Sequence, residues 1–436
     1  MTYRTSVVSL LVLALAGAAC SDGGGNAGGS GGGGPGGTGG SGGNAATGSG
    51  GSGGHDAAAG SGGSGSGTGG SASDGGATGG GSGSGGNMAP DAGGTGGAVA
   101  ATNVFLYVSG YGSTNVDVYR FNPATGALTS VSSAAAGSTP TYSVASPSNK
   151  FLYVADETSA AAITAYSIAS TGALTKLNTV KTSGQGTAHL TVSPDGKWIV
   201  AADYDSDSVD VLGINADGSL AAVSDSRPGC PAAHNVQFDP TGKFLLAACK
   251  SDTGKDTPRI LQFSFAAGKL TPSNPPAVMF GADPRHMTFD AAHKHLYVCT
   301  EETSQIFWFD YDAASGKISN PQMISALDAG GMPGAGGHIA FNGPYLYVAN
   351  RSDSSIGIFS VDAAGKPQSV AWQRMGTVDV REFSFDPSGK YMIVANQTPS
   401  QVTVFKIDGA SGKLTAVGSP LAAKSQAAAV TVVGLP

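Results

Sequence analysis

Apolar and polar residues alternate in short runs along residues 101–436, and one kind of run recurs seven times. Each run opens with an aromatic residue or a histidine, continues with two or three apolar residues, and mostly follows a turn rich in Gly, Asn, Asp or Pro. The seven runs begin at Phe105, Phe151, Trp198, Phe244, His295, Tyr345 and Tyr391, at intervals of 46, 47, 46, 51, 50 and 46 residues. A period in the forties, with several short alternating strands per unit, is typical of β-propeller blades. The pattern therefore predicts an all-β fold, a seven-bladed β-propeller.

The fifth unit shows how a blade is built. It has alternating strands at 285–290, 295–300 and 305–311, with a fourth strand after them. The first of these strands is expected to lie nearest the central channel, as the innermost strand of its blade. The first unit lacks such a strand, because residues 103–108 already correspond to the second one. We expect the β-prone C-terminal run 428–433 to supply it, which would close the ring and remove an exposed sheet edge.

The chain begins with a short apolar segment. Residues 6–19 form an apolar run after a single basic residue, Arg4. This run is too short to cross a bilayer as a helix, so residues 1–20 are interpreted as an export signal. It ends in small residues and Cys20, which resembles the processing site of bacterial lipoproteins, where the Cys becomes the lipidated N-terminus. Gly17 departs from that pattern, which usually has Leu at this place. The alternative is an ordinary cleaved signal followed by an incidental Cys.

Residues 21–100 are of low complexity. Of these 80 residues 39 are Gly, and none is Lys or Arg. Such a segment has too little apolar surface to offset its backbone entropy, so we expect it to be a disordered Gly/Ser-rich linker. As a flexible coil it would span roughly 50 Å. It would tether the domain formed by residues 101–436 and would not form a domain itself.

Composition narrows the partners of the domain. The chain has 23 Lys and Arg against 30 Asp and Glu, a formal net charge of −7, so nucleic acid is not an expected partner. Besides Cys20 it has Cys230, Cys249 and Cys299, and no pair has the spacing of metal ligands. We therefore expect no metal site and no cofactor. Cys249 and Cys299 lie in predicted strands and are interpreted as buried thiols, with a disulfide as the alternative.

Charged residues are predicted to gather on one face of the propeller. The first strand of a blade runs down and the second runs back up, so the start of one lies beside the end of the other. Residues symmetric about the turn are therefore neighbours at the mouth of the channel, a concave place where a ligand can be enclosed. In blades four to seven the charged or ionisable residues at these positions are His234, Lys250, Arg285, Glu301, Arg351 and Arg381.

This rim predicts a site for a small anionic molecule. Arg forms paired hydrogen bonds with carboxylate or phosphate. Although the chain is acidic overall, several of its Lys and Arg residues are predicted to lie on this one rim. Lys250, Arg351 and Arg381 are candidate substrate-binding residues, whereas His234 and Glu301 are candidates for proton transfer. The alternative is a solvated network of ion pairs that binds no ligand.

Three further histidines follow the rim positions by one residue. His189, His286 and His338 should point toward the channel wall or the neighbouring blade, because side chains alternate along a strand. They are interpreted as structural, hydrogen-bonded residues.

Five motifs occur in order on different blades. They lie at 233–240, 284–289, 297–301, 347–351 and 381–390. Together they resemble the lactonase family of seven-bladed propellers, which includes propeller-type 6-phosphogluconolactonases and fungal carboxymuconate cyclases. The resemblance covers residues 101–436 and implies a metal-free enzyme that hydrolyses or cycloisomerises an anionic lactone.

The resemblance also implies roles for single residues. It places the active His of the family at His234, its Arg at Arg285 and Arg351, and its Glu at Glu301. The family often has His-Pro-His in blade four, where this chain has Ala-Ala followed by His234.

The sequence thus predicts an exported, monomeric propeller, held at the membrane only by a lipid on Cys20, that hydrolyses an anionic lactone. Arg285 and Arg351 would bind the anionic group and help to stabilise the oxyanion. Glu301 or His234 would activate a water, and the other would protonate the leaving oxygen. The alternatives are a muconate-type lactone cycloisomerase and a non-enzymatic surface propeller that binds a protein or glycan through the same face.

Overall fold

The computed structural model describes residues 103–251, 257–279, 281–376 and 379–436. The expected export signal, the Gly-rich linker and the lipidation site Cys20 lie outside the described residues. Within the described part of the chain, no helix has the length and apolar character that a membrane span requires.

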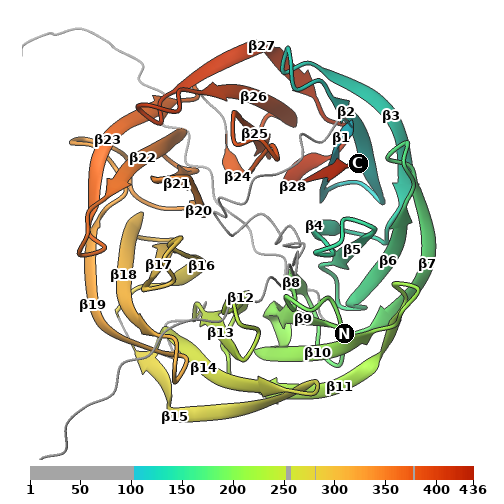
Figure 1. Cartoon of the computed structure of the whole chain (residues 1–436), viewed down its shortest axis with the longest axis vertical. Coiled ribbons are helices and arrows are strands. Elements are labelled where there is room, and N and C mark those ends of the chain that lie inside the picture. Colours follow the sequence, from blue (N-terminus) through green and yellow to red (C-terminus); the bar gives the residue numbers. More distant parts are fainter. Residues whose placement is uncertain (1–102, 252–256, 280, 377–378) are drawn as a thin grey trace, which may run out of the picture. The chain divides into compact units, whose positions relative to one another are not determined.

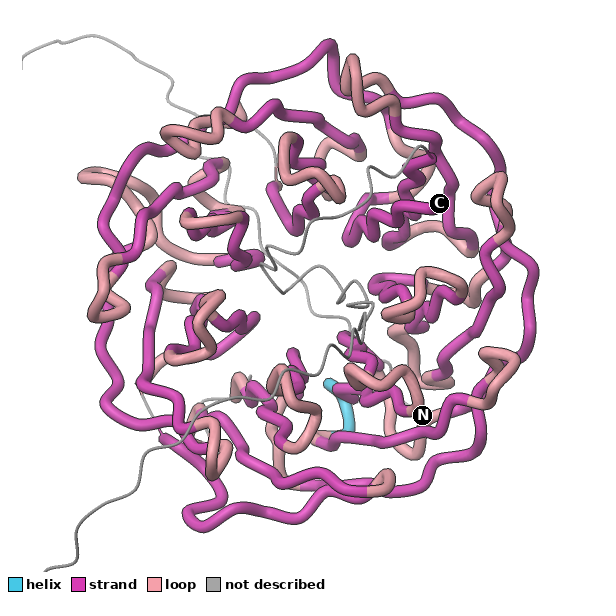
Figure 2. The backbone as a smooth tube through the Cα atoms, viewed as in Figure 1, coloured by secondary structure: helices cyan, strands magenta, loops and turns pink. Residues whose placement is uncertain are grey.

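The described residues form seven four-stranded sheets arranged around a central axis (Figures 1 and 2). Neighbouring strands within each sheet are antiparallel, and in six of the seven sheets all four strands follow one another directly along the chain. The prediction of an all-β propeller with seven blades is confirmed. In the described ranges the helical content is one short 3-10 turn, η1 (Tyr204–Ser206).

The strands fall into four concentric sets. The innermost strands of blades one to seven are β28 (Gln426–Leu435), β4 (Pro140–Ala145), β8 (Thr187–Val192), β12 (Ala233–Phe238), β16 (Pro284–Phe289), β20 (Gly336–Asn342) and β24 (Val380–Phe385). The second strands are β1 (Asn103–Tyr111), β5 (Phe151–Asp156), β9 (Trp198–Asp203), β13 (Phe244–Cys249), β17 (His295–Thr300), β21 (Tyr345–Asn350) and β25 (Tyr391–Asn396). The third strands are β2 (Asn115–Phe121), β6 (Ala162–Ile168), β10 (Ser208–Ile214), β14 (Arg259–Ala266), β18 (Gln305–Asp312), β22 (Ser355–Val361) and β26 (Gln401–Ile407). The outermost strands are β3 (Leu128–Ala135), β7 (Leu174–Lys181), β11 (Leu220–Pro228), β15 (Lys269–Met279), β19 (Lys317–Ser325), β23 (Pro367–Arg374) and β27 (Leu414–Ala422).

The C-terminal strand closes the ring. β28 pairs antiparallel with β1, with Thr431 opposite Tyr107 and Val433 opposite Phe105. The Thr431 hydroxyl also lies 2.7 Å from the Ser143 hydroxyl of β4, so the strand contacts blade two as well. The prediction that the C-terminal run completes blade one is confirmed.

Each hydrophobic core lies between blades. The seven clusters of buried residues are each drawn mainly from two neighbouring blades, for example blades four and five around Met287, Leu296 and Phe309. Because the core of a blade needs the next blade to cover it, no single blade buries its own apolar surface.

The recurring aromatic residue explains how blades fit together. In blade four Phe244 lies against Gly316, in the turn between the two outer strands of blade five; a Cβ on Gly316 would be 2.1 Å from the Phe244 ring. Gly218 faces Phe151 in the same way, also at 2.1 Å. The φ of Gly316 is +69°, a left-handed conformation that other residues adopt only at a cost. The ring and the glycine therefore form a repeated contact between adjacent blades.

A tyrosine hydroxyl reinforces this contact in several blades. Where the second strand has Tyr two places after the aromatic residue, its hydroxyl donates to the carbonyl of the glycine in that turn. Tyr107 donates to Gly172 at 3.0 Å and Tyr347 to Gly412 at 2.8 Å. The hydroxyls are buried, so these bonds satisfy groups that water cannot reach.

One cysteine prediction was wrong and another is confirmed. Cys249 is not a thiol: it forms a disulfide with Cys230, 19 residues earlier in the chain. Cys230 precedes β12, and the loop curls back so that the two Cα atoms lie 4.9 Å apart. The strand pattern locates Cys249 in β13 but does not reveal the path of this loop. Cys299 is a free, buried thiol, as predicted.

Gly316→Ala should destabilise the protein more than Gly418→Ala. Both glycines have positive φ, +69° and +64°, so both variants carry a backbone penalty of about 1–2 kcal/mol. Only Gly316 also faces an aromatic ring, and overpacking should lower the free energy of unfolding by about 1–3 kcal/mol more. The space around Gly418 is open. Denaturant unfolding of the two variants measures the difference, and equal losses would contradict the proposed contact between blades.

Candidate active site

A β-bulge occurs at the rim position of the innermost strand in every blade. In blade five Pro284 pairs with Thr300 and His286 with Cys299, which leaves Arg285 without a cross-strand partner. The pairing shifts in the same way around Ala428, Thr141, Ala188, His234, Gly337 and Arg381. A bulge re-aims side chains and interrupts the alternation of a strand. Two consecutive residues of one strand can therefore reach the same cavity.

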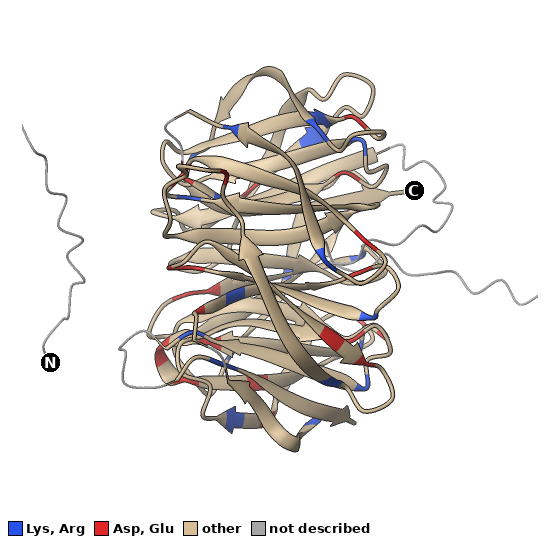
Figure 3. Ribbon diagram, turned by 90° about the vertical axis from the view of Figure 1, so that its left-hand side faces the viewer, with Lys and Arg blue, Asp and Glu red and all other residues tan. Residues whose placement is uncertain are grey.

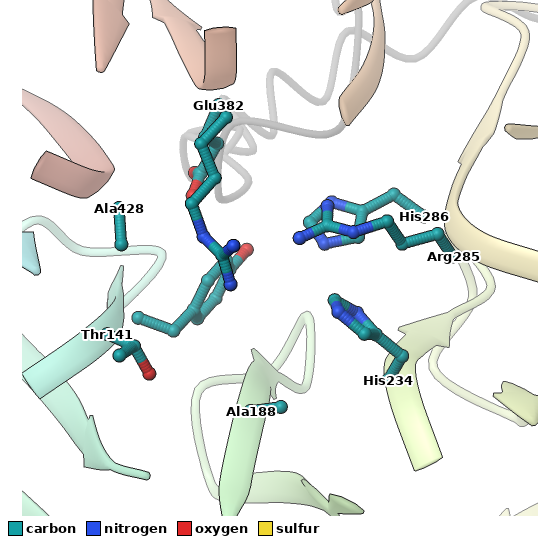
Figure 4. A pocket seen from close by; sticks show the side chains of 9 residues that line it. Thr141, Ala188, His234, Arg285, His286, Glu382 and Ala428 are labelled. Atoms are coloured by element: carbon teal, nitrogen blue, oxygen red, sulfur yellow. The ribbon is translucent and has the colours of Figure 1, made fainter. Parts of the chain in front are cut away.

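Six of these seven bulged residues, all except Gly337, line a pocket at the mouth of the channel (Figure 4). The cavity between its walls has a volume of about 10 Å³ and opens to solvent. The lining residues are Thr141, Tyr142, Ala188, His234, Arg285, His286, Arg381, Glu382 and Ala428. Figure 4 shows His234, Arg285 and His286 on one side, with Thr141 opposite them. The pocket therefore draws on the innermost strands of several blades.

Glu301 anchors a cluster of cations beside this pocket. Its carboxylate lies 2.6 Å from Lys250 Nζ and 3.4 Å from Arg285 Nε, and Arg351 Nη2 donates to Oε1. The four side chains come from blades four, five and six, and they meet at the Glu301 carboxylate. Burial by itself would raise the pKa of Glu301, but Arg285, Arg351 and Lys250 outweigh it and lower the pKa to about 2. Glu301 is therefore ionised and holds three cations together.

Arg285 links the cluster to the pocket. Its guanidinium is buried, and Nη1 donates to the backbone carbonyl of Gly337 in the next blade. Burial lowers the pKa of Arg285 to about 10, partly offset by Glu301. The side chain thus remains charged at neutral pH while one face of it lines the pocket.

His234 is neutral in the pocket. Burial, and then Arg285, Lys250 and Arg381, lower its pKa well below 6.5. Its Nδ1 is buried and has no hydrogen-bond partner among the described residues. A neutral imidazole with an unpartnered nitrogen can accept or pass on a proton.

Arg381, from the innermost strand of blade seven, also lines the pocket. It donates to the Tyr111 hydroxyl at 2.9 Å and to the Gln397 side-chain carbonyl at 3.2 Å, and it lies over the Tyr111 ring. Tyr111 in turn donates to Glu157 at 2.9 Å. The hydrogen bonds described for Arg381 thus go to neutral groups, whereas Arg351 donates one of its bonds to the Glu301 carboxylate. A partly buried guanidinium with neutral hydrogen-bond partners favours an anionic ligand.

The neighbouring histidines form part of the channel wall. His189 Nε2 lies 2.8 Å from the Asn235 side-chain amide, and His286 Nδ1 lies 2.7 Å from His338 Nδ1. All three histidines are buried, and burial is the main reason why their pKa values are lowered. Hydrogen bonding of this kind agrees with a structural role. His286 also lines the pocket, next to Arg285, because the bulge at Arg285 interrupts the alternation of the strand.

The six predicted rim residues divide into two sets. His234, Arg285 and Arg381 line the pocket itself. Lys250, Glu301 and Arg351 form the ion cluster, which contacts the pocket through Arg285.

Sequence reasoning missed Tyr142, His286 and Glu382 as pocket residues. Each follows a bulged residue directly, and strict alternation along the strand would place it on the other side. The bulge leaves no mark in the residue pattern, so no sequence signal would have located them.

Among the described residues no group of three or more His, Cys, Asp and Glu side chains is arranged to hold a metal ion. What the described arrangement offers is positive charge around a neutral imidazole. Such a pocket can bind an anion and move a proton beside it.

Comparisons with known proteins agree with this arrangement. Residues 105–432 match the family model described as lactonase, 7-bladed beta-propeller. A Bacillus subtilis protein named 6-phosphogluconolactonase is 30% identical over 142 residues, which are 31% of this chain and 40% of that protein. A Yersinia pestis protein of the same name is 32% identical over 145 residues, 31% of this chain and 42% of that protein. The matched segments thus span less than half the length of these curated relatives.

Solved structures match over a longer stretch. The periplasmic gluconolactonase of Pseudomonas aeruginosa is 27% identical, with a TM-score of 0.70 over 77% of this chain and 100% of that chain. A protein of Bacteroides fragilis is 29% identical, with a TM-score of 0.69 over 77% of this chain and 99% of that chain. With the family model covering all seven blades, these matches lead to one conclusion: the chain belongs to the seven-bladed β-propeller lactonase family.

Proposed function

We propose that this protein hydrolyses a small anionic lactone of the sugar-acid or phosphosugar type. The observation that carries the proposal is the neutral His234, with an unpartnered Nδ1, in one pocket with the guanidinium groups of Arg285 and Arg381. The names of the relatives, 6-phosphogluconolactonase and gluconolactonase, support the same reaction class. Lactone hydrolysis develops negative charge on the carbonyl oxygen, which fixed cations can stabilise.

In the proposed binding mode Arg285 and Arg381 lie on opposite sides of the substrate. Arg285 is next to His234 and is the better placed to stabilise the developing oxyanion. Arg381 has only neutral hydrogen-bond partners described for it and would bind the anionic group of the substrate. Arg351 and Lys250 would contribute positive potential through their contacts with Glu301.

His234 is a better candidate for the general base than Glu301. A carboxylate with a pKa of about 2 is a weak base, and Glu301 already accepts contacts from three cations. In the proposed step a water attacks the lactone carbonyl carbon while its proton passes to His234. The ring C–O bond then breaks, the imidazolium returns the proton to the leaving oxygen, and a hydroxy acid results.

An anionic substrate would assist this step. Three nearby cations contribute to the lowered pKa of His234. A bound anion offsets their positive potential, so it raises the proton affinity of the imidazole when the substrate is present. The bound substrate would therefore bring the pKa of His234 closer to neutral pH, where proton transfer to a base is most effective.

Export and lipid attachment at Cys20 are part of the proposal. The disulfide between Cys230 and Cys249 supports an oxidising compartment. The match to a periplasmic gluconolactonase supports the same location. We propose that the propeller is monomeric and is held at the membrane by the lipid alone.

The proposed activity can be tested with gluconolactone and 6-phosphogluconolactone, followed by the rate of hydroxy-acid release. His234→Gln and Glu301→Gln should each lower kcat by roughly a hundredfold or more, the scale expected for losing a general base or the group that orders its surroundings. Glu302→Gln is the matched control, since Glu302 is an exposed carboxylate one residue from Glu301. Full activity in the His234→Gln/Glu301→Gln double variant would show that this rim is not the catalytic centre.

The pH dependence of kcat/KM distinguishes the two candidate bases. The pKa of His234 is lowered below 6.5, and a base must be neutral to act, so kcat/KM should stay constant above pH 6.5 and fall at lower pH as His234 is protonated. Glu301, with a pKa of about 2, would not titrate in this range. In His234→Gln the acid limb should disappear. A limb that persists unchanged in that variant would assign the titration to another group.

Cys20→Ser should release the protein from the membrane and leave the propeller folded. A single lipid-bearing residue is the proposed link to the bilayer, and the propeller begins well after it. Fractionation of cells after a salt wash measures retention, and circular dichroism checks the fold. Membrane retention of the variant would show that the attachment is of another kind.

A further inference from the structure

One corner of the rim is held less tightly by backbone hydrogen bonds than the others. In blades two to seven, the rim residue at the end of the second strand donates its backbone N–H to the loop before the innermost strand. Glu301 donates to Asp283 at 3.0 Å and Arg351 to Ala335 at 3.0 Å. In blade four the corresponding distance, from Lys250 N to the carbonyl oxygen of Ala232, is 3.4 Å. Blade four therefore has the weakest bond at this point, although it carries His234 and Lys250.

The acceptor in blade four is also in a costly conformation. Ala232 has a φ of +47°, in the left-handed region that disfavours residues with a Cβ. Blade three has Gly186 at this place, with a φ of +68°, and glycine avoids that cost.

Blade six shows how such strain can be compensated. Ala335 has a φ of +51°, and its carbonyl accepts two bonds from Arg351, one from the backbone and one from Nε, both at 3.0 Å. For the Ala232 carbonyl, the one hydrogen bond described is the long one from Lys250.

The disulfide lies at this corner. Cys249 directly precedes Lys250, and Cys230 lies two residues before Ala232 and four before His234. Both sulfur-bearing residues are buried in the core between blades three and four.

On its other side the loop is tied to blade three. The Asp207 backbone carbonyl accepts from Cys230 N at 2.9 Å, and the Asp207 carboxylate accepts from Ala232 N at 2.8 Å. The loop is thus fixed to blade three by hydrogen bonds and to β13 of its own blade by a covalent bond.

We propose that the Cys230–Cys249 disulfide is a positioning element of the active site, which holds the strained segment 229–235 against the end of β13 so that His234 and Lys250 keep their places on the rim. The inference rests on the proposed function in one respect only, the assignment of His234 as the base. The two cysteines do not touch the substrate and act through the residues that follow them.

Removal of the crosslink should loosen this corner without opening the propeller. The other six cores between blades and the pairing of β28 with β1 involve neither cysteine, so the variant leaves them intact. A misplacement of about 1 Å at a catalytic group can reduce turnover by about a hundredfold. We therefore expect Cys230→Ala/Cys249→Ala to lower kcat more than it changes KM.

The test uses the full-length protein and two readouts. The first is hydrogen–deuterium exchange by mass spectrometry: in Cys230→Ala/Cys249→Ala, segments 229–235 and 247–251 should exchange roughly tenfold faster, whereas segment 284–289 of blade five should be unchanged. The second is kcat and KM for gluconolactone and 6-phosphogluconolactone, with an expected fall in kcat on the order of tenfold or more. Cys299→Ala is the matched control, because it removes a buried cysteine that forms no disulfide.

A rescue variant separates positioning from general stability. Adding Ala232→Gly to Cys230→Ala/Cys249→Ala removes the left-handed strain and gives blade four the residue that blade three has. It should slow exchange in segment 229–235 and recover part of kcat. If the double cysteine variant does not fold well enough to assay, the triple variant is compared with Ala232→Gly alone. These two proteins differ only in the crosslink, so the comparison still measures its effect on exchange and kcat.

The outcomes are distinguishable. Unchanged exchange in segments 229–235 and 247–251, in a variant that lacks the crosslink, would overturn the proposal. So would faster exchange with unchanged kcat. If no form hydrolyses a lactone, the proposed function fails, and the exchange measurement alone decides whether the disulfide holds the rim.

Discussion

The propeller depends on a contact that each blade makes with the next. An aromatic ring at the start of the second strand lies on a glycine in the outer turn of the following blade, as Phe244 does on Gly316. Glycine is required there because a Cβ would overlap the ring and because φ is positive. Each hydrophobic core also lies between two blades, so the structure is stable only as a closed ring. β28 closes that ring by pairing with β1.

A closed ring makes it possible to hold like charges close together. Lys250, Arg285 and Arg351 come from three neighbouring blades and share the carboxylate of Glu301. Without a rigid frame these side chains would separate into solvent, since exposed ion pairs contribute little. Here they are largely buried, so the loss of Glu301 would leave buried cations facing one another. Figure 3 shows that charged residues of both signs are otherwise interspersed over the blades.

The positive charge explains the state of the histidines. His234, His286 and His338 are buried, and Arg285 adds to the effect of burial in lowering their pKa values. A neutral histidine surrounded by cations is an available proton acceptor whose affinity rises when an anion binds. The negative charge of the substrate would thus raise the pKa of the histidine that takes up the proton. This coupling is the physical basis of the proposed lactone hydrolysis.

The residue pattern alone determined the seven blades, the closure by the C-terminal strand and the contact of Arg285 with Glu301, because period, strand length and hairpin symmetry are local properties. Only the tertiary structure decided which residues line the pocket and that Cys249 forms a disulfide. The bulges of the innermost strands turn His286 and Glu382 inward, and a curled loop brings Cys230 to Cys249. Both depend on how backbones pack across strands and blades, and alternation along one strand carries no information about that packing.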